Sequence, residues 1–405
     1  MAEAWLSIIG LGEDGPAGLT PASHLALREA EFVFGGRRHL DLLGIQGQEW
    51  PLPFSIDPVL ALRGKRVAVL ASGDPFWHGV GGTFASVLDP AEYRSFPAAS
   101  TFSLAAAAMG WRIEDTICLG LHAAPLTRLR PVLTRGQRII CLLRDGQAVG
   151  ELAAYLAQSG FGLSQVTALQ ALGGPRECRF SFQADSFEIT DISAPVCAAI
   201  TVRGTPGLPA SNGLPASNGL PASNGLDDAL FDHDGQITKR WVRALTLSAL
   251  APRAGDILWD IGAGSGSVSI EFLLSNPSTR SHAIESDPTR AARARSNAES
   301  FGLGHRFHLS LTRAPEGLAN LPRPNAVFIG GGASDALLTA LWPLIPPGTR
   351  LVANAVTLEN EALFIAQQAR HGGSLLRIEL SQATALGSKR GWQAMRPIVQ
   401  WSVSK

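Results

Sequence analysis

The chain has 405 residues, of which 45% are hydrophobic and 17% are charged, and its 34 Lys and Arg residues balance its 34 Asp and Glu residues. This length suits two domains of about 200 residues each, with the composition of well-filled globular interiors. Zero net charge argues against broad electrostatic capture of nucleic acid or of an anionic membrane, so we expect neither as a partner.

The amino-terminal half alternates short β runs with helical patterns, which indicates an α/β fold. The first residues run straight into a β pattern, without a basic region or a long apolar stretch, and no segment has the length of a membrane span. We therefore expect a cytoplasmic protein. Thr20 and Pro21 are typical of the N-cap and first residue of a helix. The predicted strands are residues 6–12, 31–36, 66–73, 116–121, 138–143 and 195–202.

Three stretches of this half combine a predicted strand with glycine or small residues: 8–23, 70–84 and 96–110. Together they resemble the tetrapyrrole methylase family. Weaker similarities at 120–125 and 171–177 extend the resemblance over nearly the whole half. The family has two α/β lobes with S-adenosylmethionine held in the cleft between them, so the resemblance implies that fold and that cofactor here.

The resemblance also implies which residues contact the cofactor in this half. A second interpretation stays open for the turns themselves, because Gly-Asp-Pro at 73–75 is also an ordinary turn sequence. The residues that the resemblance places at the cofactor are Leu11, Asp74, Trp77, His78, Ser100, Thr101 and Phe102.

A tandem repeat divides the chain. The hexamer GLPASN occurs three times within residues 207–226. Gly, Pro, Ser and Asn at this density cannot bury a core, so we predict a flexible linker over 205–226. The predicted domains are therefore residues 1–204 and 227–405.

The carboxy-terminal half has the element order of a doubly wound sheet. A helix is predicted from about Thr238 to Leu250, ahead of the first strand. The last two strands look antiparallel, so we expect a seven-stranded Rossmann-like sheet with a closing hairpin. The predicted strands are residues 257–264, 281–286, 306–311, 325–331, 349–356, 375–381 and 397–403.

A glycine-rich turn follows the first of these strands. Gly262, Gly264 and Gly266 form the pattern G-x-G-x-G after Asp260. Glycines let the backbone turn tightly at a helix N-terminus and approach a ligand. A nicotinamide-dependent reductase would carry G-x-G-x-x-G, so the spacing favours S-adenosylmethionine. Glu285 ends the next strand, where an acid accepts hydrogen bonds from ribose hydroxyls, although it could instead cap the helix that starts near Asp287.

Residues 236–272, 314–318, 325–332 and 354–363 resemble the decarboxylating precorrin methyltransferase domain of cobalamin biosynthesis. This resemblance implies a class I methyltransferase fold. Asn325 departs from related methyltransferases, which often have Asp there, and this puts a catalytic role for that position in doubt. The residues that the resemblance places at S-adenosylmethionine are Thr238, Gly262, Ala263, Gly264, Ser265, Gly266, Glu285 and Ala314.

Two unrelated methyltransferase domains in one chain imply two methylations of one substrate or of successive intermediates. By resemblance, the substrate is the tetrapyrrole precorrin-6B. The first domain would methylate carbon 5, and the second would methylate carbon 15 and remove the ring-C acetate carboxylate as carbon dioxide, giving precorrin-8. Each domain would bind one S-adenosylmethionine, and we expect self-association of the chain.

A substrate with many carboxylates needs cationic partners. Lys239, Arg240 and Arg243 lie beside the second cofactor motif, and Arg37 and Arg38 are candidates in the first half. Each could equally be an ordinary charge on a solvated helix face.

The sequence identifies no catalytic acid or base and no metal site. The four cysteines form no C-x-x-C pair, and His305 and His308 have no third ligand nearby in the sequence. An alternative function is methylation of another small molecule or of RNA, with the amino-terminal half acting as a substrate-binding module. The number of S-adenosylmethionine molecules bound per chain separates these readings.

Overall fold

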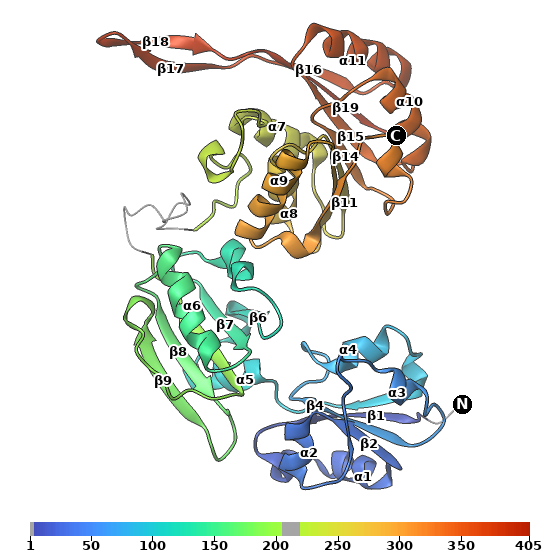
Figure 1. Cartoon of the computed structure of the whole chain (residues 1–405), viewed down its shortest axis with the longest axis vertical. Helices are drawn as coiled ribbons and strands as arrows, with labels where there is room; N and C mark the ends of the chain where they lie inside the picture. Colours follow the sequence, from blue (N-terminus) through green and yellow to red (C-terminus); the bar gives the residue numbers. More distant parts are fainter. Residues whose placement is uncertain (1–3, 205–218) are drawn as a thin grey trace. The chain divides into compact units, whose positions relative to one another are not determined.

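The structure, a computed structural model, describes residues 4–204 and 219–405. These residues form two compact units (Figure 1). One comprises residues 4–124 and 134–204, and the other comprises Pro125–Leu133 and Gly219–Lys405. Most of the predicted linker, residues 205–218, lies outside the described residues. The described part of the chain has no helix that is long and apolar enough to cross a membrane.

The first lobe of the amino-terminal unit is a parallel sheet with both faces buried. Leu6 and Ile8 pack on one face and Ile9 and Leu11 on the other, as the two-residue period of a strand requires. In sheet order the five strands are β3 (Gln48–Glu49), β2 (Phe32–Gly35), β4 (Val67–Ser72), β1 (Leu6–Leu11) and β5 (Tyr93–Phe96). The helices of this lobe are α1 (Pro21–Glu29), α2 (Arg37–Leu43), α3 (Asp57–Leu60) and α4 (Val80–Ala85). Thr20 caps α1 as predicted, because its hydroxyl accepts from Ser23 N at 3.1 Å.

The second lobe of this unit is a mixed sheet. Helix α5 (Thr101–Met109) packs Phe102 and Ala105 against Ile140 and Cys197, and α6 (Gln147–Gln158) also belongs to this lobe. In sheet order the five strands are β6 (Ile117–Gly120), β7 (Arg138–Leu143), β10 (Val196–Thr201), β8 (Gln165–Gln170) and β9 (Cys178–Gln183). Strands β3, β5, β8 and β9 were not predicted from the sequence, because polar residues interrupt or shorten the apolar runs of all four.

The second unit contains the predicted seven-stranded sheet, which is confirmed. Its first five strands are parallel, and β19 inserts antiparallel beside β15. In sheet order the strands are β13 (Phe307–Leu311), β12 (Arg280–Glu285), β11 (Ile257–Ile261), β14 (Ala326–Ile329), β15 (Arg350–Ala355), β19 (Ile398–Ser404) and β16 (Ser374–Ile378).

Helices cover both faces of this sheet (Figure 1). Leu247 and Phe272 pack against Leu258 on one face, and Leu341 and Phe364 belong to the larger cluster on the other face. The first face carries α7 (Arg240–Leu250), α8 (Ser267–Ser275) and α9 (Pro288–Ser300), and the other carries α10 (Asp335–Leu344) and α11 (Leu358–His371).

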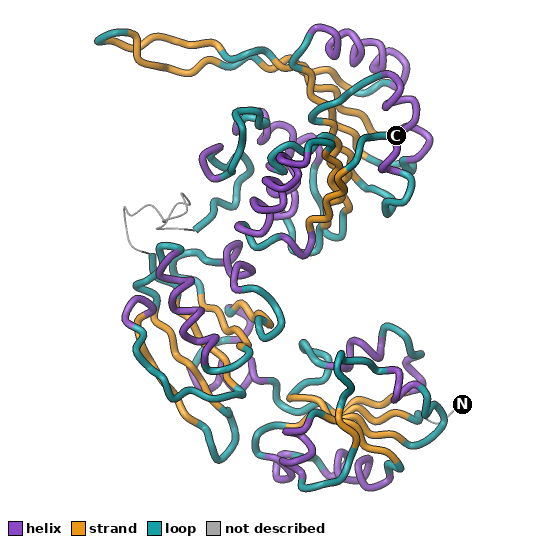
Figure 2. The backbone as a smooth tube through the Cα atoms, in the orientation of Figure 1, coloured by secondary structure: helices purple, strands orange, loops and turns teal. Residues whose placement is uncertain are grey.

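A two-stranded arm separates β16 from β19. The sequence predicted a closing hairpin, and these two strands do pair antiparallel. Their connection, however, contains β17 (Ser381–Leu386) and β18 (Lys389–Ala394), which extend beyond the sheet (Figures 1 and 2). Both arm strands are mostly exposed and lack a buried apolar face, so their sequence gave no strand signal.

A buried ion pair ties the end of the repeat segment to the second unit. Arg243 of α7 and Glu271 of α8 have exposed side-chain fractions of 0% and 1%, and their Nε and Oε1 atoms lie 2.5 Å apart. Glu271 also accepts from Gly225 N at 2.6 Å and Leu226 N at 2.9 Å. Arg243 donates in turn to the carbonyls of Leu226 and Thr238. The last residues of the predicted linker are therefore packed on the domain that follows.

The same contacts correct the expectation that Arg243 binds a substrate. Its guanidinium is fully buried and is bonded to Glu271, Asp228 and two backbone carbonyls. No surface of this side chain remains for a ligand, so we assign it a structural role.

We expect Glu271→Ala to destabilise the second unit by about 3–5 kcal/mol, because it removes the buried carboxylate that faces Arg243 Nε and leaves the buried amides of Gly225 and Leu226 without an acceptor. Urea unfolding of the full chain, followed by tryptophan fluorescence, measures this change. Arg240→Ala is the matched control on the same helix. Its ion pair with Asp227 is long, at 4.0 Å, and partly exposed, so its loss should cost less than about 1 kcal/mol. Equal effects of the two substitutions would contradict the assignment.

Candidate active site

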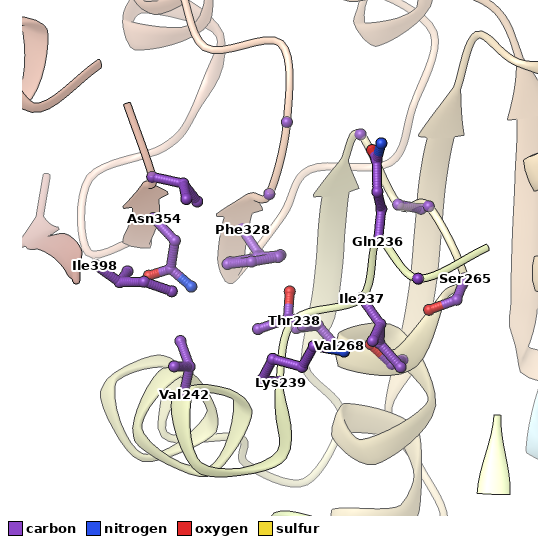
Figure 3. Close-up of a pocket in the computed structure, with 18 of the residues that line it drawn as sticks. Gln236, Ile237, Thr238, Lys239, Val242, Ser265, Val268, Phe328, Asn354 and Ile398 are labelled. Atoms are coloured by element: carbon purple, nitrogen blue, oxygen red, sulfur yellow. The ribbon is translucent and has the colours of Figure 1, made fainter. Parts of the chain in front are cut away.

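A large cavity of the second unit lies at the carboxyl ends of its parallel strands. Its volume is about 1150 Å³, and it is bordered by the ends of β11, β12, β14 and β15, by the segment before α7 and by the base of the arm (Figure 3). This edge is where doubly wound sheets bind ligands. The predicted cofactor motif and the predicted ribose acid of this half both line the cavity.

The glycine-rich turn needs its glycines for backbone reasons. Gly262, Gly264 and Gly266 have φ values of 72°, 59° and 75°. A Cβ on Gly262 would also lie 2.7 Å from the carbonyl oxygen of Gly331. The turn is pinned to the neighbouring strand, because the amides of Gly262 and Ala263 both donate to Ile284 O, at 2.9 and 3.1 Å. A side chain on Gly262 would therefore displace the turn.

Glu285 is held in place by backbone amides. One carboxylate oxygen accepts from Ser286 N and Asp287 N at 2.8 and 2.9 Å, and the other accepts from Gly264 N at 2.9 Å. The side chain lines the cavity and is 7% exposed. Capping of α9 belongs to Asp287, whose carboxylate accepts from Thr289 N and Arg290 N. The second sequence interpretation, in which Glu285 is the helix cap, is therefore wrong.

The other predicted cofactor residues of this half are close by, with one exception. Thr238, Ala263, Ser265 and Ala314 line the cavity, whereas Gly266 does not and begins α8 as its N-cap residue. Arg290 holds the segment before α7 in position, since it donates to Asp234 and Gln236, both at 2.8 Å. A turn of glycines and small residues facing an oriented carboxylate fits the amino-acid and ribose parts of S-adenosylmethionine.

Asp260 supports the turn from behind. It is fully buried, does not line the cavity, and accepts from Ser269 Oγ at 2.5 Å. Burial raises the pKa of this carboxyl to about 6, and the hydrogen bond from Ser269 opposes that rise. Its role is to connect β11 with α8, the two elements that the glycine turn joins.

The cavity wall also combines apolar residues with cations. Arg313 and Arg396 line it, and neither side chain makes an ion pair or hydrogen bond with the described residues. Lys239 lines it too, with Nζ 3.9 Å from Asp228. Arg240 does not line the cavity and stacks instead over Trp241, with its guanidinium carbon 4.6 Å from the ring centroid. Of the three cations expected in this half, Lys239 alone reaches the cavity.

Sequence reasoning missed Arg313, Arg396 and Asn354. Arg313 precedes Ala314, which the sequence did single out, and Arg396 lies in the return from the arm, which was not predicted. Asn354 begins a stretch whose resemblance was noted without a role for this residue. Asn325 lies just before β14, at the ends of the strands opposite the cavity, where its side-chain oxygen accepts from Ile257 N at 2.8 Å. Because this position does not line the cavity, an acidic side chain is not needed there to contact a ligand.

Among the described residues, His305 and His308 do not belong to a cluster of metal ligands. His308 stacks on His282 with ring centroids 4.9 Å apart, and burial lowers the pKa of His305 to about 4. Within residues 4–204 and 219–405, no three His, Cys, Asp or Glu side chains are grouped so as to hold a metal ion.

In the first unit, the candidate cofactor residues gather where β1 and β4 end. Gly73 N donates to the carbonyl of Leu11 at 2.9 Å, and Gly10 is packed so tightly that a Cβ would lie 2.0 Å from Gly73 O. Asp74 follows directly and accepts from Phe76 N at 2.9 Å, which is the turn role that the sequence also allowed. These contacts bring the ends of the two strands together.

The start of α5 meets the same region. Ser100 is the N-cap of α5, accepting from Ser103 N, and Thr101 is the first helical residue. The Phe102 side chain is 1% exposed, and the rings of Trp77 and His78 lie 4.8 and 5.9 Å from it. Phe102 therefore packs beneath the loop that contains Trp77. A cofactor could contact the backbone of Phe102 but not its buried ring.

The two candidate cations of this unit are already paired. Arg37 is exposed and bonds to Glu49 at 3.1 Å. Arg38 pairs with the buried Glu13, which also binds Arg176 of the second lobe at 3.1 Å. Glu13 thus links the two lobes of the unit through two arginines.

Comparisons with known proteins match the whole chain. A family model described as "Tetrapyrrole (Corrin/Porphyrin) Methylases" matches residues 6–186, and one described as "Precorrin methyltransferase domain" matches residues 229–405. A protein of Sinorhizobium sp named precorrin-6Y C(5,15)-methyltransferase [decarboxylating] is 45% identical over 99% of this chain and 96% of its own length. A protein of the same name from Mycobacterium tuberculosis (strain CDC 1551 / Oshkosh) is 36% identical over 98% of this chain and 99% of its own.

Solved structures are also similar to part of the chain. Among them is the C-terminal domain of precorrin-6Y C5,15-methyltransferase from Rhodobacter capsulatus, with 52% identity and a TM-score of 0.45. The match covers 46% of this chain and 100% of the chain in the solved structure.

We expect Glu285→Gln to weaken S-adenosylmethionine binding to the second unit roughly tenfold to hundredfold, because each hydrogen bond from a ribose hydroxyl is worth about 1 kcal/mol more to a carboxylate than to an amide, and the ribose has two such hydroxyls. Isothermal titration of the full chain with S-adenosylmethionine measures this affinity. Glu316→Gln changes an exposed acid outside the cavity and should leave it unchanged. A Glu285→Gln variant with normal affinity at this site would show that the ribose lies elsewhere.

Proposed function

This chain belongs to the precorrin-6Y C(5,15)-methyltransferase (decarboxylating) family, and on that premise we propose that it methylates precorrin-6B at carbons 5 and 15 and releases one carboxyl group as carbon dioxide. The observation that carries the proposal is the cavity of the second unit, in which a glycine turn and Glu285 face a partly apolar space bordered by unpaired arginines. Full-length similarity to relatives of that name supports it.

We assign carbon 15 methylation and decarboxylation to residues 227–405, and carbon 5 methylation to residues 1–204. The matched family descriptions support this division, since the precorrin domain covers 229–405 and the tetrapyrrole methylase model covers 6–186. S-adenosylmethionine is the methyl donor of this class, and we propose one site in each domain. Bound there, it supplies a methyl group already activated on a sulfonium, so the protein need not provide a nucleophile.

What the residues of the second unit must do is position the substrate and exclude water. The glycine turn has only small side chains and so admits the donor close to its backbone, and Glu285 orients the ribose of the donor. Val356, Ile378 and Ile398 supply an apolar wall against which a macrocycle can lie. A cavity of about 1150 Å³ exceeds the roughly 300–1000 Å³ of a typical single-ligand pocket, which suits two ligands side by side.

The mass of the product tests the proposed function. Incubated with precorrin-6B and S-adenosylmethionine, the full chain should add two methyl groups and remove one carbon dioxide. Gly262→Ala, which places a Cβ 2.7 Å from Gly331 O, should leave one methyl addition and no loss of carbon dioxide.

Two outcomes of that experiment, and one of a binding titration with S-adenosylmethionine, contradict the proposal at different points. No change in mass with the unaltered chain would mean that precorrin-6B is not the substrate. Retained decarboxylation in the Gly262→Ala chain would reverse the assignment of the domains. Binding of one S-adenosylmethionine per chain, with the first domain empty, would favour the alternative in which that domain is a substrate-binding module.

We expect Arg313→Ala and Arg396→Ala each to raise the KM for precorrin-6B roughly tenfold, since a partly exposed charged contact is worth about 1.4 kcal/mol. The dissociation constant for S-adenosylmethionine should stay within twofold. Arg370→Ala, an exposed cation of α11 outside the cavity, is the control and should change neither constant. Arginine variants that weaken donor binding instead would place the donor, and not the substrate carboxylates, at these side chains.

A further inference from the structure

Asn354 is a polar side chain in an otherwise apolar part of the cavity wall. It lies near the end of β15, is 8% exposed, and lines the cavity with Val242, Phe328 and Ile398 (Figure 3). In the sheet order, β15 is three strands away from β12, which carries Glu285. At about 4.8 Å per strand this separates Asn354 from the ribose acid by roughly 14 Å. Asn354 therefore belongs to a different part of the cavity from the ribose site.

A buried network fixes the orientation of the Asn354 amide. Gln400 lies directly opposite on β19, and its Nε2 is 3.0 Å from Asn354 Oδ1. Asn354 Nδ2 lies 2.9 Å from Thr246 Oγ1 of α7, and Gln400 Nε2 lies 3.1 Å from the same hydroxyl. Thr246 donates its one hydroxyl proton to Val242 O at 2.9 Å, so both amides must present N–H groups to it.

This assignment leaves a defined donor on Asn354. The amide has two N–H bonds, and Thr246 takes one of them. The second N–H, like the remaining lone pair of the carbonyl, has no partner in the network and is on the side chain that lines the cavity. Figure 3 shows the Asn354 side chain on the cavity wall with Phe328, Ile398 and Val242. Water can satisfy this donor until a ligand fills the cavity.

We propose that the second N–H of Asn354 donates a hydrogen bond to an acceptor atom of the tetrapyrrole and thereby sets which face and edge of the macrocycle meet the methyl donor. Thr246 and Gln400 are positioning residues, which act by holding the amide. The inference rests on the proposed function. A ligand that displaces water from this wall must offer an acceptor, because a buried N–H without one is costly.

The first test compares Asn354→Asp with the unaltered full chain. The carboxylate has the same shape but no donor, and its charge faces a substrate rich in carboxylates. We expect kcat/KM for carbon dioxide release from precorrin-6B to fall roughly tenfold to hundredfold, the equivalent of one hydrogen bond. The dissociation constant for S-adenosylmethionine, a cation, should be unchanged or lower. Equal weakening of substrate and donor would indicate general damage to the site and overturn the proposal.

The second test uses Thr246, which touches no ligand in this proposal. Thr246→Val keeps the shape but removes the acceptor of both amides, so the Asn354 amide is free to rotate. The expected result is a lower kcat/KM for precorrin-6B with unchanged donor affinity. Thr246→Ser restores the hydroxyl and should recover most of the rate. A purely structural network would lower the unfolding midpoint in Thr246→Val and leave kcat/KM at the unaltered value.

Different results would contradict the proposed function and the role of Asn354. If the unaltered chain releases no carbon dioxide from precorrin-6B, the proposed function fails and this inference falls with it. If the unaltered chain is active and both Asn354→Asp and Thr246→Val keep its kcat/KM, the inference about Asn354 fails alone.

Discussion

The candidate site of the second unit depends on one close approach of two backbone segments. Gly262, at the end of β11, lies against Gly331, which follows β14, with no space for a Cβ between them. Because of this approach, the chain leaves β11 in a left-handed conformation and turns directly toward α8. The same turn brings the amide of Gly264 to Glu285 of β12. Three adjacent strands therefore converge on one point, and a single added methyl group would separate them.

Helix α7 couples the stability of this unit to the shape of its cavity. Val242 and Thr246, one turn apart, face the sheet, where one lines the cavity and the other holds the Asn354 amide. Arg243, between them, is buried against Glu271 and fixes both the carbonyl of Thr238 and the end of the repeat segment. The segment that leads into α7 is thus held by a core ion pair. Its backbone, including Thr238, forms part of the cavity wall.

The first unit also depends on a close approach of two strand ends, although its fold is different. Its candidate cofactor residues also follow parallel strands, and Gly10 and Gly73 let the ends of β1 and β4 approach closely. Here, however, the site lies beside a second lobe, and the buried Glu13 joins the lobes through Arg38 and Arg176. The lobes of this unit are joined both by these ion pairs and by the packing of Phe102 against Trp77, whereas the core of the second unit is closed mainly by apolar clusters.

Local sequence patterns were sufficient for the strands with continuous apolar runs, for the cap at Thr20, and for the glycine turn with its acid at Glu285. Each of these follows from residues close in sequence, whose spacing sets the backbone path and the register. The tertiary structure decided the remaining features: the burial of Arg243, the docking of Leu226, the arrival of Arg313 and Arg396 at one cavity, and the orientation of Asn354 by Thr246 and Gln400. The residues that make these contacts are far apart in the sequence: Arg243 and Asp228 are separated by 15 residues, and Thr246 and Gln400 by 154. No local pattern encodes such contacts, because charge and amide geometry acquire their roles when packing removes water from around them.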